Sequence, residues 1–368
     1  MKKALIVSTV SRQFSLFEQG NIETLVELGY EVHAAANYSD ADDRLNSLNI
    51  VRHHIDIERS PFSLKNIKAY KQLKKLMDGQ HFDVVHSHSP VGGVLGRLAA
   101  KKAKVPKVLY TAHGFHFFKG APLKNWLLFY PVERSLAKIT DYLVTINQED
   151  FERAKKFKVR GSCVNVPGIG FDSSKFELPG ETRALKRKEL GISENTLVIL
   201  TIGEMIKRKN HRTMIEAFAK ADINNSLLLI CGRGELLDEL KALTRELGVE
   251  DKVSFLGYRK DIPEICKMSD IFIFSSFQEG LPVSVMEAMA AGLPVVASDI
   301  RGSSELVIRD KGGYLMKPKD VESFANYTVK LASDPSLRAK MREWNLKKVK
   351  NYEKGVVKSL MLKVYSSL

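Results

Sequence analysis

The sequence predicts an α/β protein built on two doubly wound parallel sheets. Three observations lead to this fold class. Short apolar runs of strand length alternate with amphipathic segments of helical period along the chain. The 368 residues are more than one ordinary domain needs. After Leu178 a polar, charged segment interrupts the alternation, which then restarts. We therefore predict one domain over residues 1–178 and a second over residues 179–350.

In the first half, strands and helices are expected in regular alternation. Apolar runs predict strands over residues 3–10, 31–36, 82–89, 107–118, 141–147 and 163–167. One continuous helix is expected from Ser15 to Leu28, because Gly29 is a typical residue at a helix end. Residues 63–78 predict an amphipathic helix with an apolar side and a lysine side.

The second half repeats this rhythm. Strands are predicted over residues 197–203, 226–235, 252–258, 270–276, 294–299 and 313–317. Helices are predicted between them, including one over 283–291 that Gly292 and Pro294 end. Helices also finish the chain, with a break near Tyr352.

Composition limits the partners and the compartment. The net charge is +14, and residues 1–170 hold 25 Lys and Arg against 16 Asp and Glu. A basic half implies an anionic partner, which could be nucleic acid, lipid headgroups or a phosphorylated small molecule. No apolar run reaches 18 residues, and the first residues lack a signal-peptide cleavage site. Three widely spaced cysteines, with Cys231 and Cys266 expected in the core, are typical of a reduced cytosolic protein.

Residues 274–299 carry the most informative pattern. Glu279 follows an apolar strand, a Gly-Leu-Pro turn comes next, and Glu287 lies eight residues after Glu279. In an open α/β sheet, ligands bind at the carboxyl ends of the strands. Two carboxylates there suit a hydroxyl-rich ligand. The alternative is a solvated helix N-terminus, where the dipole alone favours acids.

Three strand ends of the second half have features that hold a pyrophosphate: cations before a helix, glycines that admit backbone close to a ligand, and backbone N–H groups. These are, in chain order, Lys207, Arg208 and Lys209 after Gly203; Gly232 and Gly234; and Gly280 with Leu281. Their joint occurrence favours a nucleotide-sugar. No Walker motif occurs, and no GxGxxG follows the first strand of either half, which argues against an ATPase or a dinucleotide dehydrogenase.

Two residue pairs have the spacing of metal ligands. Asp40 and Asp42 form a DxD triplet, but the polar run around them is typical of a solvated turn. His86 and His88 alternate along a strand and point the same way. No carboxylate or cysteine near them in the sequence completes a ligand set, so we interpret them as hydrogen-bonded strand-end histidines. We predict no metal and no other cofactor.

Two segments of the first half are candidates for contact with an anionic membrane. The lysine side of the 63–78 helix fits such a contact, although a merely solvated face looks the same. The aromatic segment over 115–130 is typical either of a core or of an interfacial anchor. The candidate residues are Lys65, Lys68, Phe115, Phe117 and Lys119.

The pattern as a whole resembles a known family. The residues that carry the resemblance are 203–209, Gly232-Arg233-Gly234, Glu279-Gly280-Leu281-Pro282 with Glu287, PVVASDIRGSSELV at 294–307, and TAHGFHF at 111–117. They are similar to the retaining GT-B glycosyltransferases of family GT4, especially bacterial enzymes of extracellular and capsular polysaccharide assembly. The resemblance implies two Rossmann-like domains that face each other across a cleft, with residues 351–368 packing back on the first domain.

The resemblance also implies residue roles. The three catalytic candidates are Glu279, which would contact hydroxyls of the donor sugar, Lys209, which would neutralise the leaving diphosphate, and His113, which would lie beside the reacting carbon. Glu287 would bind the ribose. Further donor-side residues are Glu204, Arg208, Gly232, Gly234, Tyr258, Arg259, Gly280, Leu281 and Pro282. The residues predicted on the acceptor or membrane side, which follow from the position and composition of their own segments, are Ser11, Arg12, Lys65, Lys68, Phe115, Phe117 and Lys119.

Two positions depart from the family pattern. Glu204 stands where many relatives have an arginine, so one phosphate cation is missing and Arg208 is expected to compensate. Ser11 and Arg12 lie in a first loop that the family commonly builds from a Gly-Gly pair. The acceptor contacts of that loop are therefore not carried over from the family.

The resemblance implies a retaining, metal-independent hexosyl- or N-acetylhexosaminyltransferase. We expect transfer from a UDP-sugar to a polyprenyl-diphosphate-linked saccharide at the cytoplasmic face of the plasma membrane, beside other polysaccharide-assembly enzymes. The alternatives are transfer to a soluble acceptor and a non-catalytic subunit that binds a nucleotide-sugar. A non-hydrolysing UDP-sugar epimerase shares the architecture but fits the two-glutamate arrangement poorly. We expect no nucleic-acid binding.

Overall fold

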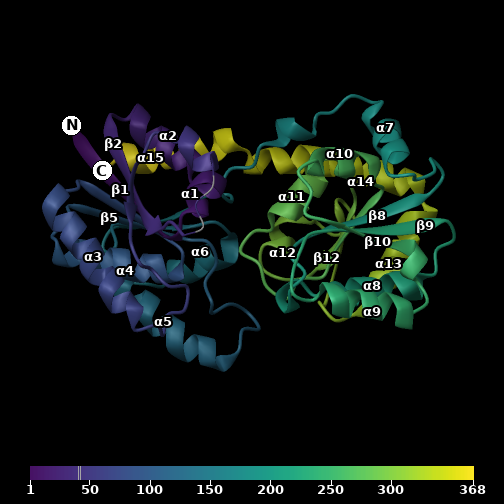
Figure 1. Ribbon diagram of the computed structural model, residues 1–368, viewed down its shortest axis with the longest axis horizontal. Coiled ribbons are helices and arrows are strands. Elements are labelled where there is room, and N and C mark those ends of the chain that lie inside the picture. The colour runs from purple at the N-terminus through teal and green to yellow at the C-terminus, as the bar shows by residue number, and fades with distance from the viewer. Residues whose placement is uncertain (40, 42) are drawn as a thin grey trace. The chain divides into compact units, whose positions relative to one another are not determined.

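The computed structural model describes residues 1–39, 41 and 43–368. Asp40 and Asp42, the DxD pair, lie outside the described residues. Contacts divide the chain into two compact units, Met1–Gly170 with Lys354–Leu368, and Phe171–Glu353. The first crossing between units thus comes a few residues before the expected boundary at Leu178. Each unit is a parallel sheet with helices on both faces (Figure 1).

The first unit contains a seven-stranded sheet in the order β3-β2-β1-β4-β5-β6-β7. Its strands are β1 (Lys2–Val10), β2 (Tyr30–Asn37), β3 (Val51–His54), β4 (Val84–His88), β5 (Lys107–Ala112), β6 (Tyr142–Thr145) and β7 (Ser162–Asn165). Its α-helices are α1 (Arg12–Phe17), α2 (Gln19–Glu27), α3 (Lys65–Gln80), α4 (Pro90–Lys102), α5 (Leu123–Ala137), α6 (Gln148–Ala154) and α15 (Lys354–Ser366). All six predicted strands are present. The sequence does not predict β3, because this edge strand is short, mostly exposed and lacks an apolar run.

The second unit contains a six-stranded sheet in the order β10-β9-β8-β11-β12-β13. Its strands are β8 (Leu197–Ile202), β9 (Ser226–Cys231), β10 (Val253–Gly257), β11 (Ile271–Phe274), β12 (Val295–Ser298) and β13 (Gly313–Met316). Its α-helices are α7 (Thr182–Glu189), α8 (His211–Ala221), α9 (Leu237–Glu246), α10 (Ile262–Met268), α11 (Val283–Ala290), α12 (Ser303–Leu306), α13 (Val321–Ser333) and α14 (Pro335–Val349). The predicted strands of this half are confirmed.

Each sheet has a point where the strand order reverses direction. In the first unit this point lies between β1 and β4, and in the second it lies between β8 and β11. The connections from neighbouring strands run to opposite faces there, which leaves a crevice at the carboxyl ends. His88 ends β4, and Glu279 lies in the loop that follows β11. The second sheet therefore directs the predicted site residue Glu279 to the position where ligands bind in this architecture. The first sheet directs His88 there, a residue that we interpret from the sequence as structural.

The predicted continuous helix from Ser15 to Leu28 is wrong. The structure has two helices, α1 and α2, with Glu18 between them in a non-helical conformation. The Glu18 side chain is 1% exposed and points into the unit, where it meets two histidines. The helix is broken at Glu18 because the carboxylate turns inward to histidines that lie far away in the sequence.

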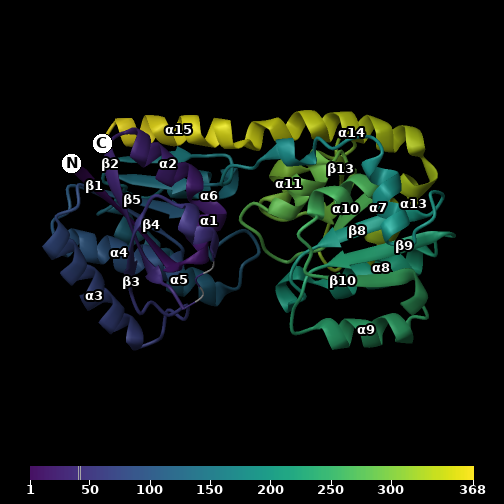
Figure 2. The same cartoon turned by 45° about the horizontal axis from the view of Figure 1, so that its top comes forward.

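The C-terminal segment returns to the first unit, as the resemblance implies. A 3-10 turn, Lys350–Tyr352, separates α14 from α15 at the predicted break. On α15, Met361, Val364 and Tyr365 are buried in the core of the first unit. Figure 2 shows α15 alongside α2, to which Lys358 is tied by an ion pair with Glu27 at 2.6 Å.

Arg187 of α7 joins the first helix of the second unit to its sheet. The side chain is fully buried, and its guanidinium reaches several backbone oxygens and one carboxylate. These acceptors are the backbone oxygens of Ser193, Glu194, Thr196 and Met268 and the carboxylate of Asp270. Arg183 also donates to Asp270 but is 34% exposed.

We expect Arg187→Ala to lower the free energy of unfolding of the second unit by about 3 kcal/mol, because several buried acceptors lose their donor at once. Arg183→Ala is the matched control, since it removes a partly solvated donor to the same carboxylate, and we expect it to cost about 1 kcal/mol or less. Chemical denaturation measures both. Equal losses for the two variants would contradict this account.

Candidate active site

Glu279 lies just beyond β11, and three side chains hold one of its oxygens. Lys209 Nζ lies 2.8 Å and Arg208 Nη1 2.7 Å from Glu279 Oε1. The Ser276 hydroxyl donates to the same atom over 2.8 Å. The Glu279 side chain is only 11% exposed, and the two cations beside it make charge-assisted contacts with this oxygen. Among the described residues none donates to Oε2, so this oxygen can accept a hydrogen bond from a ligand hydroxyl.

The loop after β8 turns only its last cation inward. The other two are exposed, whereas the Lys209 side chain is 14% exposed and lies over the Phe274 ring at 5.2 Å. Asn210 follows with a left-handed φ of 54°, and its amide donates to the backbone oxygen of Ser275 over 3.0 Å. This corner ties the end of β8 to the end of β11. It thereby fixes the position of Lys209 beside Glu279.

Gly232 and Gly234 bring two backbone loops into contact. A Cβ on Gly232 would clash with the carbonyl oxygen of Gly203, and a Cβ on Gly234 with the backbone of Met205. The Met205 amide donates to the backbone oxygen of Arg233 over 2.9 Å. The glycines are therefore needed for packing the loop after β9 on the loop after β8. Their role in donor binding stays a prediction.

Glu287 lies on α11, and its side-chain carboxyl has no hydrogen-bonding partner in the described part of the chain. Burial of its carboxyl raises its pKa to about 7, and the positive charge of Lys175 acts in the opposite direction. The side chain is half-buried, and its carboxyl has lost part of its water without gaining a donor among the described residues, so it has hydrogen-bonding capacity to spare. A ligand diol would satisfy it, which is the role that the resemblance implies.

The other donor-side residues have varied surroundings. Gly280, Leu281 and Pro282 form the turn that leads from Glu279 into α11. Glu204 is exposed, and Tyr258 is 59% exposed with the Arg233 guanidinium 5.8 Å from its ring centre. Arg259 donates to both oxygens of Asp261 over 2.8 and 2.6 Å, so this cation already has an acidic partner.

His113, which follows β5, is the exposed end of a buried polar network. His113 Nε2 lies 3.1 Å from His88 Nδ1 and 3.5 Å from Glu18 Oε1, and His88 Nδ1 lies 3.0 Å from the same oxygen. The Gln13 amide nitrogen lies 3.2 Å from His113 Nε2. The His113 side chain is 24% exposed, whereas those of Glu18 and His88 are buried.

The charge state of this network follows from its contacts. Burial opposes ionisation of Glu18, but His88 and His113 together lower the pKa of its carboxyl well below the usual value. Burial lowers the pKa of His88, against the opposing charge of Glu18. A neutral His88 with its proton on Nδ1 donates to Glu18. Its Nε2, which has no hydrogen-bond partner among the described residues, then carries no N–H that needs one.

The sequence-based interpretation of His86 and His88 is half right. Both ring nitrogens of His86 are hydrogen-bonded, as expected. The expectation that no carboxylate accompanies the pair is wrong in three dimensions. Glu18, His88 and His113 bring three atoms of metal-ligand type within 4.8 Å of one another. Hydrogen bonds account for this arrangement without an ion, and the absence of a metal stays a prediction.

Glu18 is the site residue that the sequence reasoning missed. The available signal was its place on the apolar stripe of its segment. Phe14, Ile22 and Leu25 share that stripe and are buried, so an acid between them at helical spacing implies a buried carboxylate that must find donors.

Phe115 and Phe117 do not project outward as interfacial anchors. They are 2% and 0% exposed and belong to a core cluster with Phe157, so the anchor interpretation is wrong for them. Their rings stack at 4.7 Å and contribute to the floor of a cavity in the first unit. The exposed apolar side chains of this segment instead come from α5, on Leu123 and Leu127.

The polar residues predicted on the acceptor or membrane side lie mostly at the surface. Ser11 is buried directly before α1, and Arg12, Lys65, Lys68 and Lys119 are exposed. Lys65 lies 3.4 Å from Glu58, and Lys68 lies 2.7 Å from Asp56. These acids partly compensate the positive charge on which the predicted membrane contact of α3 depends.

Comparison with known proteins identifies the family. The profile of "Glycosyl transferases group 1" matches residues 182–348, and that of "Glycosyl transferase 4-like" matches residues 5–147. The chain is 38% identical over its full length to EpsD of Bacillus subtilis (strain 168), provisionally named a glycosyltransferase, and covers 97% of it. The chain belongs to the group 1 glycosyltransferases.

Other comparisons agree with this assignment. The chain is 35% identical to the UDP-Gal:alpha-D-GlcNAc-diphosphoundecaprenol alpha-1,3-galactosyltransferase of Escherichia coli, over 74% of this chain and 72% of that enzyme. Anabaena HepE, solved in complex with UDP-glucose, superposes with a TM-score of 0.81 at 19% identity, over the full length of both chains. The GT-B fold and the glycosyltransferase activity that the resemblance implied are thus confirmed.

Replacing Glu287 tests whether its carboxyl lowers the free energy of unfolding and at the same time contributes to nucleotide binding. Because the folded-state pKa is raised, wild type loses stability as pH rises from about 4.5 to about 7. Glu287→Gln removes the buried charge, so we expect it to raise the free energy of unfolding at pH 8 by up to about 3 kcal/mol and to change little at pH 4. UDP affinity, measured by calorimetry, should fall about tenfold at pH 8.

The control for this test is Glu246→Gln, an exposed glutamate of α9, which should change neither quantity. A Glu287→Gln variant that binds UDP like wild type would remove Glu287 from the donor site, whatever its stability.

Replacing Glu18 tests whether the buried network positions His113 in this glycosyltransferase. We expect Glu18→Gln to lower kcat for glycosyl transfer about tenfold or more, because His88 and His113 lose the charge that orients them. The KM for the donor should stay unchanged, since Glu18 is buried and both of its carboxyl oxygens already accept hydrogen bonds from the protein. Glu23→Gln, on the exposed side of α2, is the control. A wild-type kcat for Glu18→Gln would show that the network is only structural.

Proposed function

We propose that this enzyme transfers a sugar from a UDP-sugar to a saccharide carried on a polyprenyl diphosphate, in the synthesis of a bacterial surface polysaccharide. The named substrates of the Escherichia coli relative and the UDP-glucose bound to HepE support the donor and acceptor classes. Retention of anomeric configuration is part of the proposal.

The arrangement of Glu279 with Lys209 and Arg208 is the observation that carries the proposal. An ammonium offers three donors and a guanidinium five, so both cations keep N–H groups for a diphosphate while they hold Glu279. Their charge would stabilise the diphosphate as it leaves, without solvent reorganisation. The free Oε2 of Glu279 would accept from a hydroxyl of the donor sugar. Glu287 would take the ribose diol.

A metal ion has no necessary place in this scheme. In other phosphate chemistry a divalent cation neutralises the leaving group, and here two side chains supply that charge. The charge of Arg208 also replaces the arginine that is absent at Glu204. Metal independence is therefore part of the proposal.

The surface of the first unit supports peripheral attachment to the inner face of the plasma membrane. Large apolar side chains are exposed on the loop before α3, on the first turn of α3 and on α5: Phe62, Leu64, Ile67, Leu123, Leu127, Leu128 and Val132. Exposed lysines at the end of α4 accompany them, a combination typical of an interfacial surface. In the part of the chain that the structure describes, no helix has both the length and the apolar character of a membrane span.

Product mass after incubation with a set of UDP-sugars and a synthetic polyprenyl-diphosphate saccharide tests the proposal. We expect glycosyl transfer by wild type without added metal and in the presence of EDTA. Glu279→Gln should lower kcat about 100-fold, because the sugar contact and the fixed position of both cations are lost.

The matched control is Glu239→Gln, which removes a glutamate paired with Arg212 at 3.1 Å elsewhere in the same unit. It should leave kcat unchanged. Transfer to a soluble saccharide but to no lipid-linked one would instead favour the soluble-acceptor alternative.

A further inference from the structure

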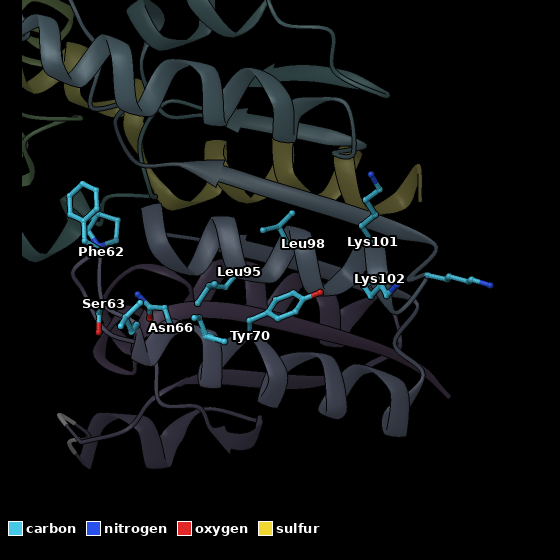
Figure 3. A pocket seen from close by; sticks show the side chains of 12 residues that line it. Phe62, Ser63, Asn66, Tyr70, Leu95, Leu98, Lys101 and Lys102 are labelled. Carbon is cyan, nitrogen blue, oxygen red and sulfur yellow. The ribbon is translucent and has the colours of Figure 1, made fainter.

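Two cavities of the first unit lie next to each other and share part of their lining. One, of about 590 Å³, opens beside Thr9, Ser89 and Gly114 at the carboxyl ends of β1, β4 and β5. The other, of about 730 Å³, lies between α3 and α4 (Figure 3). Pro61, Phe62, Asn66 and Leu95 line both cavities. We call the two neighbouring cavities together the α3–α4 groove; each has the size of a small-molecule pocket.

The α3–α4 groove is apolar along its length and basic at its outer end. In Figure 3, Phe62 lies at one end, Leu95, Leu98 and Tyr70 follow, and Lys101 and Lys102 lie at the other end. Phe62 is 73%, Ile67 57% and Leu98 40% exposed. Several strongly exposed apolar side chains along one groove are typical of a binding surface.

The loop that carries Phe62 is held in place. The Asn66 side chain is buried; its amide oxygen accepts from the Glu58 backbone N–H over 3.0 Å, and its amide nitrogen donates to the Ser60 backbone oxygen over 2.9 Å. The groove is therefore formed before a ligand arrives, which lowers the cost of binding.

Charge around the groove favours an anionic amphiphile. Lys101, Lys102 and Lys104 lie at the outer end, and Arg59 lines the inner part. Among the described lining residues Glu133 is the only acid, and Arg97 Nη2 donates to its two oxygens over 3.0 and 2.9 Å. No uncompensated acid lining the groove would therefore repel a diphosphate.

We infer that the α3–α4 groove binds the isoprenoid chain of the lipid-diphosphate acceptor, an inference that rests on the proposed function. The saccharide would lie at the strand ends near His113, and the diphosphate beside Arg59. The chain would pass Phe62, run between α3 and α4, and leave beside Lys101, Lys102 and Lys104 toward anionic headgroups. The apolar length of the groove fits the isoprenoid chain, and its flanking cations fit the diphosphate and the anionic headgroups. Its opening at the strand ends fits the saccharide.

Calorimetry with geranylgeranyl diphosphate, inorganic diphosphate and a lysophosphatidic acid tests this inference on the full chain. We expect geranylgeranyl diphosphate to bind at least about tenfold more tightly than inorganic diphosphate, since only its chain can use the groove. Ile67→Ser combined with Leu98→Ser should abolish this preference and leave inorganic diphosphate binding unchanged. The lysophosphatidic acid should bind more weakly than the isoprenoid.

The control is Leu185→Ser combined with Leu247→Ser, because these leucines are 62% and 37% exposed in the second unit, outside the groove. This variant should bind all three probes like wild type. Equal binding of geranylgeranyl and inorganic diphosphate by wild type would overturn the inference. Equal binding of the lysophosphatidic acid would also overturn it, in favour of a general acyl site.

Transfer assays separate this inference from the proposed function. Wild type that transfers to polyprenyl- and short-chain-linked acceptors with equal KM would refute the groove and leave the proposed function intact. Wild type that binds geranylgeranyl diphosphate through the groove, but transfers to no lipid-linked acceptor, would refute the proposed function alone.

Discussion

The second unit depends on a single carboxylate oxygen, Oε1 of Glu279. It accepts from Lys209 and Arg208 of the loop after β8 and from Ser276 of the loop after β11. The strand order reverses between these two strands, which is where a crevice forms at the carboxyl ends of an open α/β sheet. The shared oxygen holds the two loops together there. The structural ion pair and the cation pair that we propose for phosphate binding are thus the same atoms, so the proposed site would be ordered before a ligand binds.

Most of the fold could be predicted because helices cover both faces of each sheet. Strands buried on two faces are nearly continuous apolar runs, and these are the easiest pattern to recognise in a sequence. The exceptions share one cause. Val51–His54 forms an edge strand by pairing with β2 and contains no such run. Glu18 breaks a predicted helix because its partners, His88 and His113, lie far along the chain. Non-local pairing decides both cases, and local pattern cannot show it.

The candidate site was predictable on the donor side and less so on the acceptor side. Glu279, Lys209 and the glycines follow strand ends at spacings that carry their own signal. In the first unit, Phe115 and Phe117 have the composition of an anchor but form a core, because their segment turns back over Phe157. The exposed apolar surface lies instead on Phe62 and on α5. Composition identifies such a segment, but only the packing decides which of its side chains reach solvent.

Glu18, Glu279 and Glu287 differ in how many of their carboxyl oxygens already accept hydrogen bonds from the protein. This number determines how well each glutamate can still bind a ligand. Glu18 uses both: Gln13 and His88 approach Oε1 at 3.0 Å, and Asn21 donates to Oε2 over 2.7 Å. It has little hydrogen-bonding capacity left for a ligand, so it can act only through His113.

Glu279 accepts hydrogen bonds at one carboxyl oxygen, and Glu287 accepts at neither among the described residues. A fully satisfied acid stabilises its own unit, whereas an unsatisfied one destabilises it until a donor arrives. Burial raises the pKa of Glu287 to about 7, which agrees with its lack of a donor. Because both of its carboxyl oxygens are unused among the described residues, Glu287 is the glutamate best suited to gain from a ligand with two adjacent hydroxyls.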